Sequence, residues 1–299
     1  MTVLQDFYRR QLMEWPLASG NVKALFGVCT RTLVPAGHED GMPFVVQHNP
    51  ARVRSTGAKV DAASVAARPC FLCGASRSGE QSALEPAAFG DRFSDLDYEI
   101  LINPYPIFPY HFTIPCKAHT PQVIVEEGCR RFDDMLRLAQ ALEGMALFYN
   151  GARCGASAPD HFHFQAVPAS AMTILSTERP VPFLTFGYES GDRAEMLEWF
   201  VRVVEQIRDL PAPPDFSSSE KEPRMNIICT YTDGIWKALV IPRRAHRPDF
   251  YGSGEGQYLI SPATVDLSGT IIIPSSSDFD AITPEILASL LSQTTYPVL

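Results

Sequence analysis

Two histidines and a glutamine alternate with phenylalanines along the stretch Asp160-His-Phe-His-Phe-Gln165. Because successive side chains of an extended chain point to opposite faces, His161, His163 and Gln165 would share one face of a strand. An imidazole can attack phosphorus, accept a proton or bind a metal ion, and a nearby amide can hydrogen-bond a phosphoryl group. The spacing therefore predicts an active centre. The alternative, a surface strand with its polar side chains outward, accounts for one histidine more readily than for this set.

A loop of small residues, from Gly151 to Pro159, comes directly before this strand. Consecutive backbone amides in a turn can form an anion-binding hollow, so the amides around Gly155 and the hydroxyl of Ser157 could contact phosphate oxygens. Arg153 lies inside the loop and is a better candidate for a phosphate contact than most other cations of the chain. The loop therefore predicts a phosphate site next to the histidines.

Two cationic clusters lie elsewhere in the chain. Arg52, Arg54 and Lys59 follow Asn49-Pro50, and the segment from Pro242 to Arg247 contains further arginines and a histidine. A protein with a formal net charge of −9 needs local positive charge in order to bind a polyphosphate. Each cation taken singly is more often a solvated surface charge, so these residues are only candidates.

A Cys-x-x-Cys pair, Cys70 and Cys73, lies between Arg68 and Gly74. Such a turn can place two thiolates on one metal ion, but a tetrahedral site needs two further ligands. Two reduced core cysteines are the competing interpretation. A thioredoxin-like redox role is less favoured, because no strand-then-helix pattern surrounds the pair. The odd total of seven cysteines also argues for thiols or metal ligands over a disulfide framework.

Composition limits the class of protein. The chain has 299 residues, of which 45% are hydrophobic and 20% are charged, which suits a globular enzyme with a sizeable core. Its acidity disfavours broad binding to nucleic acid or to an anionic membrane. No apolar run is long enough to span a bilayer, and the first residues lack the pattern of a signal peptide. We therefore expect a cytoplasmic protein with no nucleic-acid or membrane partner.

The spacing of apolar residues predicts the elements that position the motif. Residues 1 to about 30 favour helix, and strands are expected over 98–103 and 112–115, on either side of a proline-rich turn. Helical spacing extends over 132–150, with Asn150-Gly151 as a stop signal. Further expected elements are the strand at 161–167, a helix at 192–208, a loop at 211–223, a hairpin at 225–231 and 235–241, and a strand at 270–273.

This order predicts an α+β fold, an antiparallel sheet with helices packed on it. We divide the chain into an N-terminal half, residues 1–175, which carries the histidine motif and the cysteine pair, and a C-terminal half, residues 176–299. The two halves have loosely similar layouts, which hints at an internal duplication, although no clear sequence repeat supports it.

The segment from Asn150 to Gln165 resembles the active-site segment of the histidine-triad superfamily. The resemblance is to its His-x-His-x-Gln branch, which holds galactose-1-phosphate uridylyltransferases, dinucleoside-polyphosphate phosphorylases and GDP-hexose phosphorylases. In that branch an Asn, a Gly and a Ser precede the motif, and the second His is the covalent nucleophile. One departure is visible, since the gap between Ser and His is one residue longer than in the uridylyltransferases. The matching positions are Asn150, Gly155, Ser157, His161, His163 and Gln165.

Two other segments extend the resemblance. Residues 102–119 are similar to the strand–turn–strand of histidine-triad proteins, in which an Asn, here Asn103, lies near the nucleotide ribose. A plain hairpin would explain the prolines of this segment but not its company with the histidine motif. Residues 261–269 are similar to a C-terminal segment of the GDP-hexose phosphorylases, and the residues alone suggest no role for them.

The resemblance also implies ligands and cations. Some uridylyltransferases bind a structural zinc ion through a Cys-x-x-Cys, a later His and the first His of the motif, which here implies Cys70, Cys73, His119 and His161. Such a closed site would fix the strand that carries His163. The uridylyltransferases also carry basic residues after an Asn-Pro, which implies Arg52, Arg54 and Lys59 as substrate contacts.

The function implied is that of a nucleotidyltransferase with a histidine-triad-like fold. His163 would take a nucleotidyl group from a nucleotide sugar or a dinucleoside polyphosphate, and phosphate or a sugar phosphate would accept it. An NDP-hexose phosphorylase is the first choice, a dinucleoside-polyphosphate phosphorylase the second and a hexose-1-phosphate uridylyltransferase the third. Relatives suggest a homodimer. The alternative is a non-catalytic nucleotide-binding or regulatory protein on the same fold.

Overall fold

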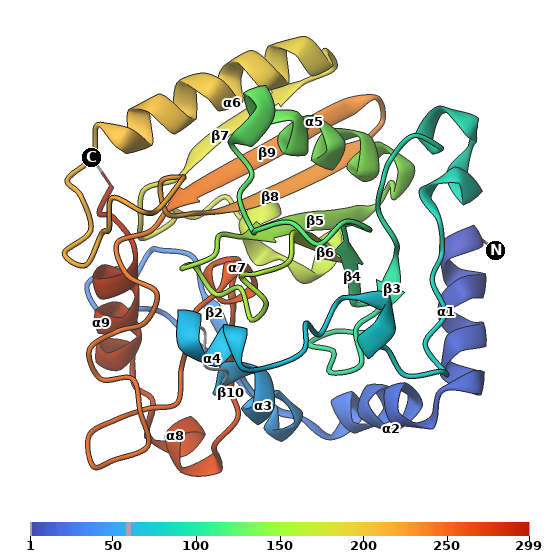
Figure 1. The fold of residues 1–299 in the computed structure, drawn as a ribbon. Helices are drawn as coiled ribbons and strands as arrows, with labels where there is room; N and C mark the ends of the chain where they lie inside the picture. Colours follow the sequence, from blue (N-terminus) through green and yellow to red (C-terminus); the bar gives the residue numbers. More distant parts are fainter. Residues whose placement is uncertain (1, 58–60, 299) are drawn as a thin grey trace.

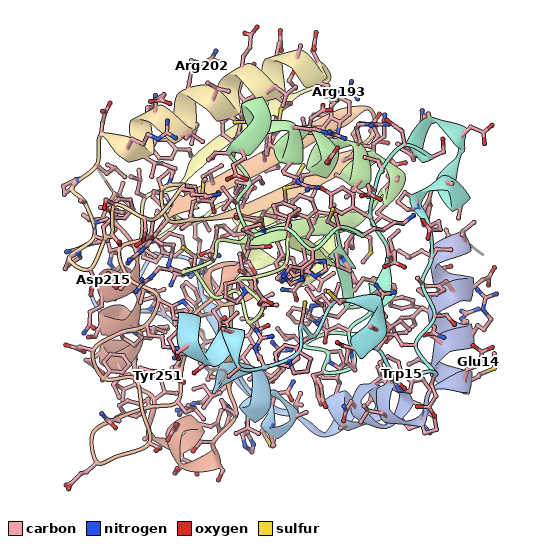
Figure 2. All side chains as sticks on the ribbon, viewed as in Figure 1. Glu14, Trp15, Arg193, Arg202, Asp215 and Tyr251 are labelled. Carbon is pink, nitrogen blue, oxygen red and sulfur yellow. The ribbon has the colours of Figure 1, made fainter. Side chains whose placement is uncertain are left out.

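The computed structural model describes residues 2–57 and 61–298 (Figure 1). The chain begins with two helices, α1 (Val3–Glu14) and α2 (Pro16–Ala24). The side chain of Thr2 caps α1 by accepting the N–H of Gln5, and the side chain of Gln5 accepts the N–H of Thr2 in return. Trp15, at the corner between the two helices, is buried in the core and anchors both of them (Figure 2).

Most strands join one antiparallel sheet. Among the described residues it has seven strands in the order β3-β4-β6-β5-β8-β9-β7. The sheet is continuous across the division at residue 175, because β5 pairs with β8. The strands are β3 (Leu101–Ile102), β4 (Phe112–Pro115), β5 (Met145–Asn150), β6 (His163–Pro168), β7 (Phe186–Ser190), β8 (Met225–Thr232) and β9 (Ile235–Pro242).

A smaller sheet forms from both ends of the chain. β1 (Cys29–Leu33) pairs antiparallel with β2 (Phe44–His48), and β10 (Thr270–Ile273) pairs with β2 in parallel. A parallel pair needs a long connection. Here that connection is most of the protein, so the small sheet ties the C-terminal residues to the N-terminal ones.

Helices and the small sheet cover opposite faces of the large sheet. α5 (Glu126–Ala141) and α6 (Arg193–Arg208) lie together on one face, where the rings of Phe132 and Phe200 stack with centroids 4.0 Å apart (Figure 1). On the other face a second apolar cluster joins the sheet to β2 and β10 and to helices of the C-terminal segment. Those helices are α7 (Thr264–Leu267), α8 (Ser276–Ala281) and α9 (Pro284–Thr294), and two short helices, α3 (Val53–Thr56) and α4 (Ala62–Ala66), lie earlier in the chain.

The predicted α+β fold with an antiparallel sheet is confirmed, whereas the helix predicted over 132–150 is confirmed only as far as Ala141 and is wrong beyond it. α5 ends at Ala141, Gly144 turns the chain with a φ of +85°, and residues 145–150 form β5. Every residue of β5 is buried, since both faces of this central strand are covered. A strand that is apolar on both faces shows no alternation, and its residues therefore continued the helical spacing of α5.

The other predicted strands, the helix after residue 192 and the hairpin at Asp233-Gly234 are present, whereas β1, β2 and β7 were missed. Residues 161–162 come just before β6, which begins at His163. In residues 2–57 and 61–298, no helix combines the length and the apolar character that a membrane crossing needs.

Candidate active site

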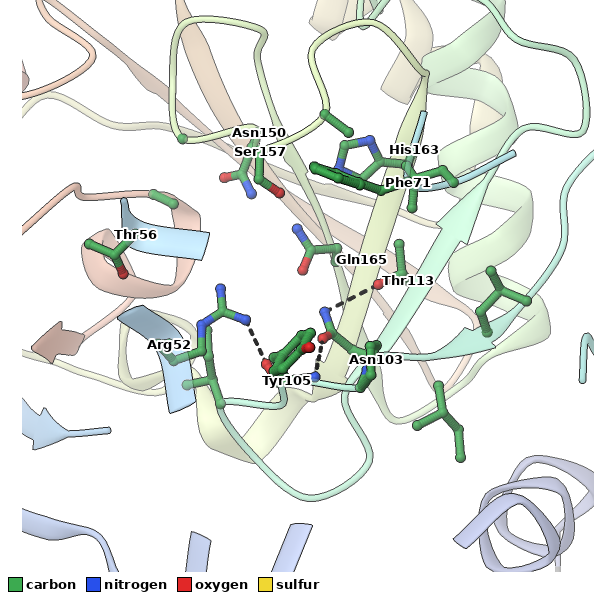
Figure 3. A pocket seen from close by; sticks show the side chains of 18 of the residues that line it. Arg52, Thr56, Phe71, Asn103, Tyr105, Thr113, Asn150, Ser157, His163 and Gln165 are labelled. Carbon is green, nitrogen blue, oxygen red and sulfur yellow. Dashed lines mark hydrogen bonds between the residues drawn. The ribbon is translucent and has the colours of Figure 1, made fainter. Parts of the chain in front are cut away.

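A cavity of about 610 Å³ lies on the face of the large sheet that is turned away from α5 and α6 (Figure 3). Alternation around β6 sends Phe162 and Phe164 into the core beneath the helices and sends His163 and Gln165 into this cavity. His161, which was predicted on the same face, does not line it. The far wall comes from Arg52 and Thr56 and from residues within 64–81 and 261–272. The predicted catalytic and substrate-binding residues that line the cavity are Arg52, Asn103, Asn150, Gly155, Ser157, His163 and Gln165.

The ring of His163 has a defined tautomer. Its Nδ1 lies 2.8 Å from the carbonyl oxygen of His161, which can only accept, so Nδ1 carries the proton. The lone pair is therefore on Nε2, the ring nitrogen that points away from the backbone. Burial lowers the pKa of His163 to about 4, despite its hydrogen bond to His161, so the ring is neutral near pH 7. A neutral imidazole with a fixed tautomer is suited to nucleophilic attack.

Gln122 fixes the backbone of this strand. Its side-chain oxygen accepts the N–H of His163 at 2.8 Å, and its side-chain nitrogen donates to the carbonyl oxygens of His163 at 2.9 Å and Asn150 at 3.0 Å. One buried amide therefore links the start of β6 to the end of β5. This holds His163 and Asn150 at a fixed separation.

Gln165 and Asn150 present their amides to the same cavity (Figure 3). The side-chain oxygen of Gln165 lies 2.9 Å from Nε2 of the buried His111. The side-chain oxygen of Asn150 accepts the N–H of Thr264 at 2.9 Å, the hydroxyl of Thr264 at 2.7 Å and the amide of Asn226 at 2.9 Å. In each amide the oxygen faces protein donors.

The loop before β6 packs tightly against the C-terminal segment. Gly155 has a φ of +98°, and a Cβ on it would lie 2.4 Å from the Cβ of Ala263, so only glycine fits this position. Its N–H donates to Nδ1 of His246 at 3.3 Å. The amide of Gly155 thus has a protein acceptor, while the side chain of Ser157 faces the cavity beside Asn150 (Figure 3).

Arg52 and Asn103 lie at the end of the cavity farther from the loop. Arg52 donates to the carbonyl oxygen of Tyr105 at 2.6 Å, and its guanidinium faces the cavity (Figure 3). Burial lowers the pKa of Arg52 to about 10, although Asp266 opposes this, so the group stays cationic at neutral pH. The side chain of Asn103 accepts the N–H of Tyr105 at 2.9 Å and donates to Thr113 at 3.2 Å.

The remaining predicted contacts lie elsewhere. Arg153 lines a second, smaller hollow behind the loop, where its guanidinium is 2.9 Å from the carboxylate of Asp215. An ion pair on that side turns Arg153 away from the His163 cavity. Arg54 lies in α3, its side chain is not among the described groups, and Lys59 is outside the described residues.

Four predicted ligands, Cys70, Cys73, His119 and His161, form a cluster that could hold a metal ion, with donor atoms all within 4.8 Å of one another. Sγ of Cys70 is 3.2 Å from Nδ1 of His161, and Sγ of Cys73 is 3.2 Å from Nδ1 of His119. Tetrahedral zinc separates its S and N ligands by roughly 3.5 Å, so the set lies close to the spacing that the ion needs. Nε2 of His161 lies 2.7 Å from the carbonyl oxygen of Cys116, which leaves Nδ1 for the metal.

His161 therefore faces the cluster and is not among the residues that line the cavity. The cluster nevertheless touches the cavity through the two residues between its cysteines, Phe71 and Leu72, which form part of the cavity wall. The guanidinium of Arg68 stacks 3.9 Å above the ring of Phe71 and pairs with Asp160 at 3.1 Å. The segment that carries the cysteine pair therefore contacts the histidine segment at two points, through Cys70 at His161 and through Arg68 at Asp160.

Several residues that build the site were not predicted from the sequence. His111 and Tyr105 lie in the segment that was compared with the strand–turn–strand of histidine-triad proteins. Their polar side chains are visible in the sequence, but the sequence does not show which residues they contact. Gln122 lies in a loop and carries no pattern at all. Thr264 lies in the C-terminal segment that resembled the GDP-hexose phosphorylases, and its bonds to Asn150 now give that segment a structural role.

Comparison with solved structures places the fold. The chain is similar to a crystal structure of yeast Ap4A phosphorylase Apa2, with 15% identity, a TM-score of 0.63 and coverage of 94% of this chain and 97% of that chain. The complex of Apa2 with Ap4A has 14% identity and a TM-score of 0.65, with coverage of 99% of this chain and 98% of that chain. The complex with AMP has 15% identity and a TM-score of 0.60, with coverage of 96% of this chain and 97% of that chain. At this identity the likeness concerns the fold alone, and it agrees with the predicted α+β fold built on an antiparallel sheet.

Comparison by sequence gives two further results. No curated protein was found to match the chain. A family model matches residues 7–168, a span that contains the cysteine pair, the loop and β6. This match covers more than half of the chain, which therefore belongs to the family described as "Domain of unknown function (DUF4922)".

Proposed function

We propose that this protein is a nucleotidyltransferase, with phosphorolysis favoured, and that His163 forms a covalent nucleotidyl intermediate. The observation that carries the proposal is the tautomer of His163. Its Nδ1–H is fixed on the carbonyl oxygen of His161 at 2.8 Å, which leaves the Nε2 lone pair for attack in a cavity lined by amides and by arginines that include Arg52.

In the first step, Nε2 of His163 attacks the α-phosphorus of a nucleotide phosphoanhydride. A P–N bond forms while the bond from phosphorus to the bridging oxygen breaks. That oxygen leaves with the electron pair as part of a sugar phosphate when the substrate is a nucleotide sugar, or as part of a nucleoside polyphosphate when it is a dinucleoside polyphosphate. In the second step an oxygen of orthophosphate or of a sugar phosphate attacks the same phosphorus, and the P–N bond breaks. Two displacements at one site predict ping-pong kinetics.

Amide and hydroxyl donors would stabilise the charge that builds up on the phosphoryl oxygens. Gln165 is adjacent to His163 on the same face of β6, and Asn150 and Ser157 lie on the loop side of the cavity (Figure 3). Donors fixed before the reaction stabilise a transition state more than mobile ones do. Arg52 adds a cation at the end of the cavity where the remaining phosphates or the ribose would lie.

Zinc in the cluster of Cys70, Cys73, His119 and His161 would be structural, because four protein ligands leave no open position. When bound, the ion holds the cysteine turn against the segment before His163. Phe71 and Leu72 would then stay in position in the cavity wall. The carbonyl oxygen of His161 would continue to accept the Nδ1–H of His163.

The substrate class is a nucleotide sugar or a dinucleoside polyphosphate. The run from His161 to Ala166 favours the first, through its likeness to the GDP-hexose phosphorylases. The fold favours the second, because the structures that it resembles are those of an Ap4A phosphorylase, one of them in complex with Ap4A. Both substrates carry the same reacting group, a phosphoanhydride next to a nucleoside, so the proposal for His163 is common to them.

The test is intact-protein mass spectrometry after brief incubation with NDP-sugars and dinucleoside polyphosphates, without acceptor. We expect wild type to gain the mass of one nucleoside monophosphate, His163→Ala to gain none, and His38→Ala, a change at an exposed histidine, to behave like wild type. Later addition of orthophosphate should remove the label. Labelling of His163→Ala to the same extent would refute the proposed nucleophile, and nucleotide binding without any adduct would favour the non-catalytic alternative.

A further inference from the structure

The two cavity amides are each held through the side-chain oxygen, that of Gln165 by His111 and that of Asn150 by Thr264 and Asn226. We propose that His111 and Thr264 are positioning residues, which turn the NH2 groups of Gln165 and Asn150 toward the nucleotidyl phosphate. This inference rests on the proposed function and extends it, because neither residue belongs to the motif or lines the cavity as a substrate contact.

For Gln165, the argument starts from the tautomer of His111. The N–H of Ile107 donates to Nδ1 of His111 at 3.2 Å, so Nδ1 carries a lone pair and Nε2 carries the proton. Nε2 lies 2.9 Å from the side-chain oxygen of Gln165 and donates to it. If the amide were turned over, its NH2 group would meet the N–H of His111. The NH2 group of Gln165 must therefore face the cavity.

Two other features keep His111 in this state. The ring is fully buried, and burial, followed by the charge of Arg52, lowers its pKa to about 3, so it stays neutral across the physiological range. The amide nitrogen of Asn103 lies 3.5 Å from Nε2 but donates to Thr113 over a shorter distance, 3.2 Å. The proton on Nε2 is thus left for Gln165.

For Asn150, the donors come from the C-terminal half of the chain. Thr264 donates its backbone N–H to the side-chain oxygen of Asn150, and Asn226 donates an amide N–H. The hydroxyl of Thr264 lies 2.7 Å from the same oxygen and donates to it over a shorter distance than to the carbonyl oxygen of Tyr149, which is 3.0 Å away. These three donors meet one carbonyl oxygen, so the nitrogen of Asn150 is the group left for the cavity. Asp266 supports Thr264 from behind, because its carboxylate accepts the N–H of Ala263 at 2.9 Å and closes the first turn of α7.

The orientation matters because an amide has a donor end and an acceptor end. A flipped amide would place its oxygen against a phosphate oxygen and turn an attraction into a repulsion. Loss of one oriented donor in an anion-stabilising site slows catalysis by about 10²- to 10³-fold in known cases. We expect an effect of at most that order when His111 is removed, and a smaller one when only the hydroxyl of Thr264 is removed, since two donors then remain.

The first experiment needs no substrate. NMR of protein labelled with 15N-histidine should show His111 as the Nε2–H tautomer, and a Nδ1–H tautomer would overturn the proposal for Gln165. Relaxation of the side-chain NH2 signal of Asn150 should show an equally high order parameter, that of a rigid amide, in wild type and in Thr264→Ser. In Thr264→Val it should fall clearly, and equal order in all three proteins would overturn the proposal for Asn150.

The second experiment measures the rate of adduct formation on His163. His111→Phe should slow it by about as much as Gln165→Ala, by roughly 10²-fold. The double variant should show little further loss, because His111 acts through Gln165. A double variant that loses the product of both effects would instead assign His111 a general structural role. If wild type forms no adduct with any substrate, the proposed function fails, and the NMR results alone decide whether the two amides are held as described.

Discussion

Glu222 should make the stability of this protein fall as pH rises. Its carboxyl group is buried behind the active-site loop, where it lies 2.5 Å from the hydroxyl of Tyr149 and accepts the N–H of Ile124 at 2.7 Å. Burial raises the pKa of Glu222 from 4.5 to about 7, against the opposing effect of these two donors. The protonated form also fits the hydrogen bonds, since it can donate to Tyr149 while Tyr149 donates to the carbonyl oxygen of Gln122 at 3.1 Å.

The sign and the size follow from proton linkage. Between the two pKa values the unfolded chain has lost the proton of Glu222 and the folded protein still holds it, so the free energy of unfolding decreases as pH rises from about 4.5 to about 7. Each pKa unit corresponds to about 1.4 kcal/mol, which gives about 3 kcal/mol for the full difference. Below pH 4.5 the full contribution of Glu222 to the free energy of unfolding is present, and above pH 7 it is lost.

The substitution Glu222→Gln keeps a neutral, hydrogen-bonding side chain of the same length and removes the titration. Urea unfolding of wild type and variant at several pH values between 4 and 8 gives the difference in their free energies of unfolding. We expect the free energy of unfolding of the variant to rise relative to that of wild type as pH rises, by up to about 3 kcal/mol. Glu255→Gln, a change at an exposed carboxyl, is the control. A difference that stays constant from pH 4 to pH 8 would show that Glu222 ionises normally in the folded state.

Three further predictions concern the loop, the metal cluster and the cavity. Gly155→Ala should lower the free energy of unfolding by more than about 1 kcal/mol, because its Cβ would collide with Ala263 at a positive φ. Gly79→Ala is the control, since a Cβ there meets nothing within 4 Å, and thermal unfolding compares the two variants. Metal analysis should find about one zinc ion per chain in wild type and much less in Cys73→Ser, and a chelator should lower the Tm of wild type only. Gln165→Glu should slow adduct formation by roughly 10²-fold, since a carboxylate would face the phosphate; an unchanged rate would remove Gln165 from the mechanism.

The motif strand was predictable because only one of its faces is apolar. Phe162 and Phe164 enter the core and His163 and Gln165 enter the cavity, so the alternation is visible in the sequence. β5 was not predictable in this way. Ala146 and Phe148 pack toward the small sheet, while Leu147 and Tyr149 pack toward the helices, and a strand with two apolar faces looks like the continuation of a helix. The glycine at 144 was the only local sign of the break.

The candidate nucleophile and the metal cluster could be predicted from residue types and from the family resemblance, but the residues that orient them could not. Thr264 meets Asn150 across 114 positions of sequence, and Gln122 meets His163 across 41. Such contacts depend on how strands and loops are brought together in space. A single polar residue in a loop, with no periodicity around it, carries no information about its partner.

The pairing of β5 with β8 also affects how the protein is made. β5 ends at Asn150 and its partner begins at Met225, so during synthesis one edge of the active-site strand stays unpaired until roughly 75 more residues have been added. An apolar strand with an open edge is a template for wrong pairing with other chains. A shortened protein that ended where the family model ends, at residue 168, would keep that edge open permanently. We therefore expect such a fragment to aggregate during expression, although it contains the complete histidine motif.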